Sequence, residues 1–407
     1  MKRLTFFLSS LILGLVAFNS CEKDPDVQDN TLVPIELTKA EQEISDKIGS
    51  FGLDLFKEVY SAQDQMLSPM SVSLALAMAD YGAEGSTHEQ ISKALGLDGF
   101  SSEEVAAYYD KMLEALVKID KNTVLSSANA VWVSKAFPVL DSYKTGVSKY
   151  FHAESNNVDF SDAATVKDIN KWVSDKTFGK ISSILNGIPT GTQMIMANAL
   201  YFQSLWADPK NPFVLSKEKM AFKDIDGADQ QFTAMTREFA AGLYAYDDTF
   251  EMLTIPYGNN AFCMDILLPV PGVAFEDAVA SLDNAKLTKL RERRTGYRVN
   301  LTMPVFKFES SLGLVDALKN LGIVKPFEDG ADFTGISSSS MSLSDVLHKT
   351  TIDVNEKGTV AAAVTAITGD GAPRSPYEAD FIVDHPFIFI IREQANGTIL
   401  FIGQKVR

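Results

Sequence analysis

Eleven consecutive residues near the C-terminus, Gly358–Thr368, carry neither charge nor proline and read GTVAAAVTAIT. A strand that slides between two packed strands cannot bring a charge into the buried layer, and proline cannot donate a hydrogen bond to the ladder. Large side chains would also obstruct its passage. The composition therefore predicts a segment that stands outside a sheet and can later enter it as a new strand, with Gly358 as the pivot.

The alternative interpretation of this segment is an alanine-rich helix or an idle loop. β-branched residues disfavour a helix, and the segment holds Val360, Val364, Thr365, Ile367 and Thr368. In a strand, alternate residues share a face. The face that we expect to be buried holds Thr359, Ala361, Ala363, Thr365 and Ile367, and the other face holds Val360, Ala362, Val364 and Ala366.

The rest of the chain has the composition of a globular domain. Of 407 residues, 46% are hydrophobic and 22% are charged, which is enough for an ordinary core. No linker-like stretch or repeat divides residues 37–407, so we expect one large domain there. The formal net charge of -16 argues against nucleic acid as a partner, because phosphate binding needs clustered cations.

Helical patterns come early in the chain and strand patterns later. Thr38 and Glu41 have capping-box spacing, and Ser68 with Pro69 opens a helix that is apolar on most sides. Strand-like segments follow at 124–134, 194–204, 251–269 with a turn at 258–260, and 297–310. Gly322 can end a later helix, and a final hairpin turns at 396–397. This order predicts an α+β fold.

The N-terminus has the pattern of an export signal. Lys2 and Arg3 precede an apolar stretch that is short for a membrane span, so residues 1–20 are predicted to be a signal peptide. The Asn-Ser-Cys that ends at Cys21 resembles a bacterial lipoprotein processing site. Residues 21–36 would be an acidic tether after the lipidated Cys21, similar to the surface-export signal of Bacteroidetes lipoproteins. We expect an exported outer-membrane or cell-surface lipoprotein that meets the membrane only through its lipid. Phe18 replaces the usual Leu, so plain secretion remains the alternative.

The sequence holds few candidates for catalysis. It has four histidines, and it lacks the G-x-S-x-G, H-E-x-x-H, phosphate-loop and dinucleotide motifs. We interpret His348 as a hydrogen-bonded core residue of a strand, and Cys263, within an apolar run, as a buried inert thiol. A hydrolase is therefore the least favoured alternative, and we expect no catalytic residue, metal or cofactor.

Five segments, taken together and in order, resemble the serpin family. They are SPMSVSLALAMADYGAEG at 68–85, NALYFQSLW at 198–206, FESSLGLVDALKNLGI with FEDGADFTGIS at 308–337, VNEKGTVAAAVTA at 354–366 and DHPFIFIIREQANGTILFIGQKV at 384–406. The resemblance covers residues 37–407. It implies a fold of three β-sheets and eight to nine helices, with an exposed reactive loop at about 356–385 that serves as protease bait.

The resemblance also implies roles for particular residues. The hinge of the loop would be Glu356, Gly358, Thr359, Val360, Ala361, Ala362 and Ala363, in which Val360 replaces a common acid. A polar "shutter" beneath the opening of the sheet would hold Ser68, Ser71, Asn198 and His348. Trp206 would mark the "breach", where insertion begins. A lysine that often pairs with the hinge glutamate is replaced by Val305, so we expect that ion pair to be absent.

The resemblance implies a suicide-substrate inhibitor of serine proteases, and it leaves the bait bond open. Family spacing from Glu356 points to Ala372–Pro373, but proline after the cleaved bond is poor chemistry for most serine proteases. Arg374–Ser375 offers a residue that suits trypsin-like enzymes and is slightly favoured. We expect a monomer whose partners are trypsin-like or elastase-like serine proteases, with cysteine proteases as a further class. The alternative is a serpin-fold binding protein or protease substrate without inhibitory activity.

Overall fold

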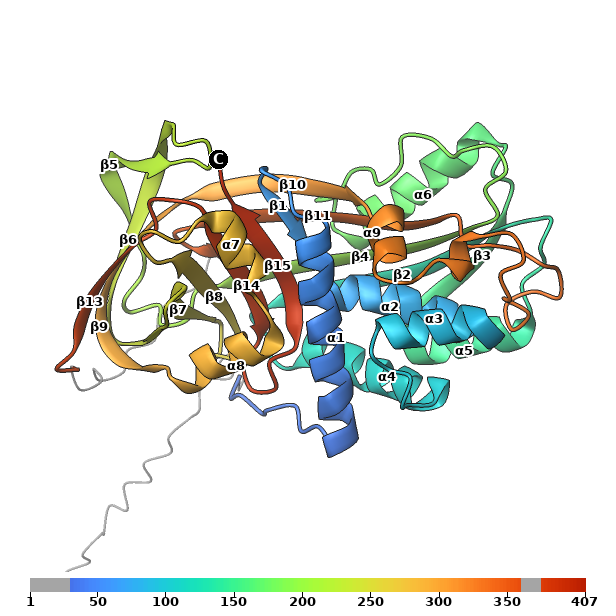
Figure 1. Cartoon of the computed structure of the whole chain (residues 1–407), viewed down its shortest axis with the longest axis horizontal. Helices are drawn as coiled ribbons and strands as arrows, with labels where there is room; N and C mark the ends of the chain where they lie inside the picture. The colour runs from blue at the N-terminus through green and yellow to red at the C-terminus, as the bar shows by residue number, and fades with distance from the viewer. Residues whose placement is uncertain (1–29, 360–374) are drawn as a thin grey trace, which may run out of the picture.

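The computed structural model describes residues 30–359 and 375–407, and nine α-helices lie within these ranges. Six of them precede most of the strands, and three short helices follow later (Figure 1). The helices are α1 (Lys39–Glu58), α2 (Pro69–Asp80), α3 (Gly85–Ala94), α4 (Ser102–Lys118), α5 (Asp141–Phe151), α6 (Ala163–Lys176), α7 (Phe275–Ala280), α8 (Asn284–Glu292) and α9 (Val315–Asn320). The expected α+β class and number of helices are confirmed.

One sheet of six strands carries the start of the bait segment. Its order is β10 (Phe306–Gly313), β11 (Asp345–Asn355), β12 (Gly358–Thr359), β4 (Met194–Leu205), β2 (Val124–Ser134) and β3 (Ala153–Val158). The short strand β12 lies between β11 and β4 and is antiparallel to both. Gly358 and Thr359, the described part of the charge-free segment 358–368, thus already form a central strand.

The other nine strands form one hydrogen-bonded sheet. Its order is β1 (Gln65–Leu67), β15 (Ile399–Lys405), β14 (Phe387–Glu393), β8 (Phe262–Pro269), β7 (Phe250–Tyr257), β6 (Asp229–Tyr246), β9 (Thr295–Pro304) and β13 (Glu378–Ile382), and β5 (Val214–Lys223) pairs with β6. The expected second and third sheets are therefore joined through the long, bulged strand β6. Strands β5, β6, β9 and β13 lie together at one end of the molecule (Figure 1).

Local sequence signals account for several of these elements. The capping box of Thr38 and Glu41 opens α1, and Ser68 caps α2 with Pro69 at its first position. All twelve residues of α2 are buried, as its apolar sequence predicts. The expected turn at 258–260 joins β7 to β8, and Gly397, at φ 81°, turns the last hairpin.

The expectation of one strand over 297–310 is wrong. The segment forms β9 and β10, which belong to different sheets. Pro304 ends β9, and the N–H of Val305 bonds to Thr233 O at 2.8 Å before the chain enters β10. Both strands have the same residue preferences, so propensity alone does not reveal the change of sheet.

Two layers cover the six-stranded sheet. On one side, α2 contacts β4, β11 and β15 and so lies between the two sheets. On the other side, Ile169 and Trp172 of α6 pack on Trp132, Ile195 and Leu347. A strand added to this sheet would therefore meet a packed core on one face and the layer of α6 on the other.

The predicted tether at 21–36 is described from Asn30 onward, and that part lies on the domain. The Asn30 side chain donates to Asp120 Oδ1 at 2.7 Å, and the Asn259 amide donates to Asn30 O at 3.2 Å. Leu32 and Ile35 pack against the core. The described end of this segment is thus docked rather than extended into solvent.

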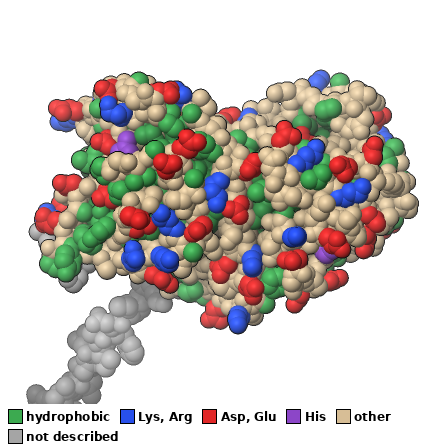
Figure 2. All heavy atoms as spheres, viewed as in Figure 1, with side chains coloured by type: hydrophobic (Ala, Val, Ile, Leu, Met, Phe, Trp, Pro, Cys, Tyr) green, Lys and Arg blue, Asp and Glu red, His purple; other side chains and the backbone are tan. Residues whose placement is uncertain are grey.

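The second cysteine of the chain lies in the core. Cys263 is fully buried in β8, as predicted, and burial raises the pKa of its thiol to about 12. Over the described residues on the face in Figure 2, basic side chains are interspersed with acidic ones.

None of the helices in the described ranges is long and apolar enough to cross a membrane.

Candidate functional site

The hinge is held in the six-stranded sheet by both neighbouring strands. Gly358 pairs with Asn355 of β11 and with Leu205 of β4, and Thr359 pairs with Val354 and Ser204. Both hinge residues are buried. Thr359 thus lies on the buried face, as its place in the alternation predicts.

Gly358 occupies a position that other residues cannot take. Its φ is +149°, and an added Cβ would lie 2.1 Å from Ser204 O and 2.7 Å from the Cα of Leu205. Both obstacles are backbone atoms of β4, which cannot swing aside as a side chain can. The close approach of the chain to β4 therefore requires glycine at this point.

Trp206 holds the residues just before the hinge. Its indole Nε1 donates to Asn355 O at 2.8 Å, and its backbone N–H donates to Lys357 O at 3.1 Å. The indole is stacked on the Tyr257 ring with the centroids 4.4 Å apart. Trp206 thus anchors the turn between β11 and β12 from the side of β4.

Glu356 lies in this turn and is partly exposed. Within the described residues, no ion pair to its carboxylate is found, and Val305 lies in the connection between β9 and β10. The turn is therefore held by backbone hydrogen bonds and Trp206 rather than by charge.

The two strands that flank β12 separate along part of their length. β11 pairs directly with β4, in parallel, only from Asp345 to His348, opposite residues 195–198. At the other end β12 lies between them. Among the described residues, the intervening stretches 349–353 of β11 and 199–203 of β4 have no ladder pairing to each other. Within the described residues, β11 and β4 thus diverge from His348 and Asn198 toward the end where β12 lies between them.

The four predicted shutter residues come together where the direct pairing of β11 and β4 ends. The Ser68 N–H donates to His348 Nε2 at 3.0 Å, and the Ser71 hydroxyl donates to Asn198 Oδ1. His348 and Asn198 are paired residues of the two strands. All four are buried.

The imidazole of His348 is neutral in this cluster. Its Nε2 accepts a hydrogen bond, so the ring proton is on Nδ1. Burial lowers the pKa of His348 to about 4. The interpretation of His348 as a hydrogen-bonded core residue of a strand agrees with this environment.

Sequence reasoning missed two residues of the site. Asn129 of β2 accepts a hydrogen bond from the Asn198 amide and donates to Phe151 O at 2.6 Å, which extends the cluster across a further strand. Tyr257 bonds to Thr359 and stacks on Trp206. An asparagine inside a strand pattern was the available signal for Asn129, whereas nothing local marks Tyr257.

The far end of the bait loop returns to the sheet at Ser375. Its hydroxyl donates to Gly296 O at 2.6 Å and its N–H to Ala240 O at 3.3 Å, before β13 pairs with β9. The other predicted residues of the loop, Val360, Ala361, Ala362, Ala363, Ala372, Pro373 and Arg374, lie outside the described residues, as does Cys21.

Comparison with known proteins agrees with this geometry. The family model described as "Serpin (serine protease inhibitor)" matches residues 46–407. The leukocyte elastase inhibitor of Xenopus laevis is 33% identical over 386 residues, which cover 89% of this chain and 99% of that protein. An uncharacterised serpin-like protein of Thermococcus kodakarensis is 31% identical over 380 residues, 90% of this chain and 86% of the relative.

Solved structures match as well. The crystal structure of tengpin, a thermophilic serpin in its native state, has a TM-score of 0.82 and 29% sequence identity, covering 93% of this chain and 97% of tengpin. Members of the family are mostly protease inhibitors rather than enzymes. The chain belongs to the serpin family.

Proposed function

We propose that this serpin is an irreversible suicide-substrate inhibitor of serine proteases, trypsin-like or elastase-like, with cysteine proteases as a further class of target. The single observation that supports this most is the divergence of β11 and β4 around β12 in the six-stranded sheet. Among the described residues, Gly358 and Thr359 lie between these two strands, and residues 360–368 that follow in the sequence carry neither charge nor proline.

The register of β12 defines where the following residues would lie. If the strand continues beyond Thr359, residues 360–364 face 353–349 of β11 and 203–199 of β4, the stretches that do not pair with each other within the described residues. Thr365 would then reach His348 and Asn198. Insertion beyond this point must separate these two paired residues, so the shutter cluster sits where the sheet first has to open.

The side chains suit this path. Alternation places Ala361 and Ala363 on the face of Thr359, toward the core. On that face they would lie between Ile352 and Phe202, and between Thr350 and Leu200, all of which are buried. Alanine fits between such neighbours without displacing them, whereas a larger or charged residue would have to disturb the core.

Insertion supplies enough free energy to deform a protease. Residues 358–372 would span about 50 Å as a strand. New ladder hydrogen bonds at about 0.5–1.5 kcal/mol each total on the order of 10 kcal/mol. A typical domain is stable by only about 5–15 kcal/mol, so a protease bonded to the end of the strand can lose its active-site geometry.

The chemistry belongs to the protease. Its serine hydroxyl attacks the carbonyl carbon of the bait bond, and the peptide nitrogen leaves with a proton supplied by the protease histidine. An acyl-enzyme ester remains on the freed end of the loop. Insertion drags this ester away before water hydrolyses it. The serpin contributes a substrate and a strand that can enter its own sheet.

We propose Arg374–Ser375 as the bait bond, with Ala372–Pro373 as the alternative. Arginine suits the acidic specificity pocket of trypsin-like enzymes, and Pro373 would hinder cleavage at the alternative bond. The hydrogen bonds of Ser375 to Gly296 and Ala240 mean that a protease must first lift Ser375 from the sheet to cleave there. Cleavage at Arg374 would therefore be slower than in a free peptide.

A direct experiment mixes the purified protein with trypsin-like and with elastase-like proteases. We expect a covalent complex that survives SDS, and mass spectrometry of the released C-terminal peptide identifies the bait bond. Cleaved inhibitor should also unfold at a temperature higher by roughly 10–15 °C, given the gain on the order of 10 kcal/mol and an unfolding entropy of about 0.8 kcal/mol/K for a domain of this size. Clean cleavage without a complex, or an unchanged unfolding temperature, would support the alternative of a non-inhibitory serpin.

A further inference from the structure

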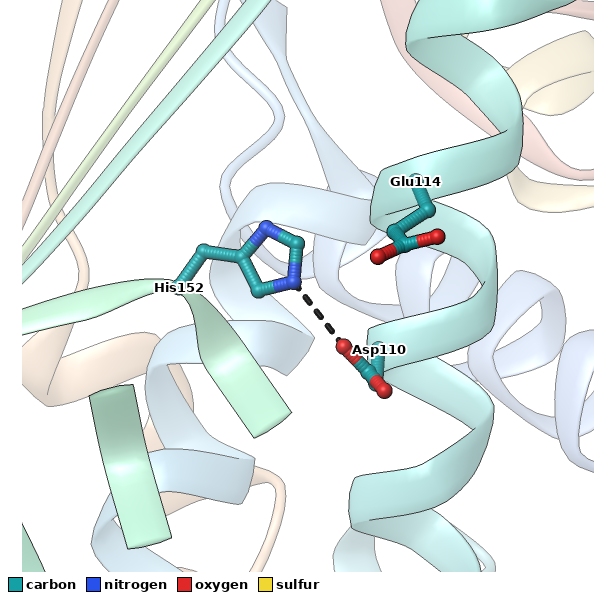
Figure 3. Close-up of side chains that lie close together, drawn as sticks. All are labelled: Asp110, Glu114 and His152. Carbon is teal, nitrogen blue, oxygen red and sulfur yellow. Dashed lines mark hydrogen bonds and ion pairs between the residues drawn. The ribbon is translucent and has the colours of Figure 1, made fainter. Parts of the chain in front are cut away.

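Three potential metal ligands converge at the edge of the six-stranded sheet, away from the bait loop. Asp110 and Glu114 are four residues apart on α4 and so share one face of that helix. His152 follows the last turn of α5 and directly precedes the edge strand β3. Figure 3 shows both carboxylates on the side of α4 that faces the imidazole.

The separations suit a common ion. One ligand atom from each of the three residues lies within 4.8 Å of the other two. His152 Nε2 and Asp110 Oδ1 are 2.9 Å apart, close to the roughly 3.3 Å between two ligands of one tetrahedral zinc ion with bonds of about 2.0–2.1 Å. Small side-chain adjustments would therefore bring all three ligands to bonding distance.

We propose that Asp110, Glu114 and His152 form a binding site for a divalent transition metal of the zinc class. Three protein ligands with water in the fourth position are a common arrangement for zinc. An imidazole nitrogen favours zinc, cobalt or nickel over calcium and magnesium, which prefer oxygen ligands. In the metal-free form the Nε2–H of His152 donates to Asp110 Oδ1. On binding, Nε2 loses this proton to solvent, a neutral ring carries its one proton on Nδ1, and the Nε2 electron pair goes to the metal.

The surroundings allow an ion to enter. The side chains of His152 and Asp110 are 40% and 37% exposed. In the structure, a lysine interacts with each carboxylate. Lys118 Nζ lies 3.3 Å from Glu114 Oε2. Lys149, which donates a hydrogen bond to the Tyr150 hydroxyl, interacts electrostatically with Asp110. Both are flexible single charges at the surface, where such pairs contribute little, so a doubly charged ion coordinated by both carboxylates displaces them.

The bound ion would connect two parts of the fold. α4 packs on α1, α2, α5 and β2, whereas His152 leads into β3 at the sheet edge. Metal–ligand bonds hold their lengths within about 0.2 Å. Binding would therefore fix α4 against the start of β3 and stabilise the native form. This inference does not rest on protease inhibition.

Calorimetric titration of the chelator-treated, untagged full chain with zinc chloride tests the proposal. We expect one saturable site, no comparable signal with magnesium, and a higher unfolding temperature in zinc. Cobalt should give a visible spectrum without the thiolate band that a cysteine ligand would produce. His152→Ala, Asp110→Asn and Glu114→Gln should each weaken binding by at least about tenfold, since even outer partners of a metal contribute that much.

His88→Ala is the matched control. His88 forms a similar pair with Asp80, at 2.8 Å, and no third ligand joins this pair among the described residues. Zinc binding should be the same in this variant as in the parent protein. A parent protein without saturable zinc binding, binding that survives His152→Ala, or equal binding of magnesium would each overturn the proposal and leave Asp110 and His152 as a simple ion pair.

Discussion

The Thr359 hydroxyl and the Tyr257 phenol oxygen lie 2.7 Å apart in a buried hydrogen bond that joins the start of the bait segment to β7. Tyr257 in turn stacks on Trp206, whose indole bonds to Asn355 just before the hinge. The first inserted residue is thus tied to the core through its side chain as well as through the ladder. Changes at Thr359 should act on insertion directly.

Thr359→Arg should convert the protein from an inhibitor into a substrate. The side chain at this position is 2% exposed, and an unpaired charge there costs several kcal/mol. Because each 1.4 kcal/mol changes a rate about tenfold, insertion should become at least tenfold slower while cleavage continues. SDS gels would show cleaved inhibitor in place of the covalent complex.

Val360→Glu provides the control for this variant. Alternation places residue 360 on the opposite face from Thr359, and the family commonly has an acid there. The yield of complex should stay near that of the parent protein. Equal inhibition by Thr359→Arg and the parent protein would contradict insertion as the source of trapping.

Gly358→Ala should weaken the native hinge. The strained φ and the contact of the new Cβ with Ser204 O would cost about 1–3 kcal/mol, so β12 should leave the sheet or the fold should lose that much stability. Urea unfolding measures the loss. Gly313→Ala in β10 is the matched control, because nothing lies within 4 Å of its added Cβ. Similar losses in the two variants would show that the approach to β4 is unimportant.

Much of the fold follows from local patterns in the sequence. The caps of α1 and α2, the burial of α2 and the turn between β7 and β8 were predictable because capping side chains, apolar runs and turn residues act over a few residues. The break at Val305, where the chain leaves β9 and enters β10 in the other sheet, could not be predicted in this way. It depends on which distant strands β9 and β10 pair with. The joining of two sheets by β6 depends on the same non-local pairing.

The candidate site also has one part that the sequence reveals and another that depends on distant contacts. The alternation of small residues marks the bait segment, because insertion restricts its composition at every position. The contact of Tyr257 with Thr359 joins residues 102 apart in the chain, and the bond between Asn198 and Asn129 joins residues 69 apart. Such contacts depend on the packing of whole strands, so the residue types alone do not reveal them. The resemblance to serpins suggested the shutter residues, but not Asn129.

We also propose that Cys21 carries a lipid that anchors the protein to the outer membrane or the cell surface, as the processing-site pattern suggests. Cys21→Ala should move the protein from the membrane fraction to the soluble fraction. The folded domain and its reaction with protease should be unaffected, because no disulfide with the buried Cys263 is involved. Membrane attachment that persists in Cys21→Ala, or a parent protein found only in the medium, would favour plain secretion.

Acid should loosen the sheet at His348. Its pKa is about 4 in the folded protein and about 6.5 in the unfolded chain, so the unfolded chain takes up the proton first as the pH falls. The stability that comes from neutral His348 is complete above about pH 6.5 and is lost as the pH falls through 4, by about 3 kcal/mol in total. A protonated ring also cannot accept the Ser68 N–H.

The variant His348→Gln tests this prediction, because glutamine keeps a hydrogen-bond acceptor without a titrating group. In urea unfolding, it should lose less stability between pH 7 and pH 4.5 than the parent protein. His385→Gln, at a partly exposed histidine, should follow the parent protein. If His348→Gln and the parent protein lose equal stability over this range, the burial of neutral His348 does not control the acid response.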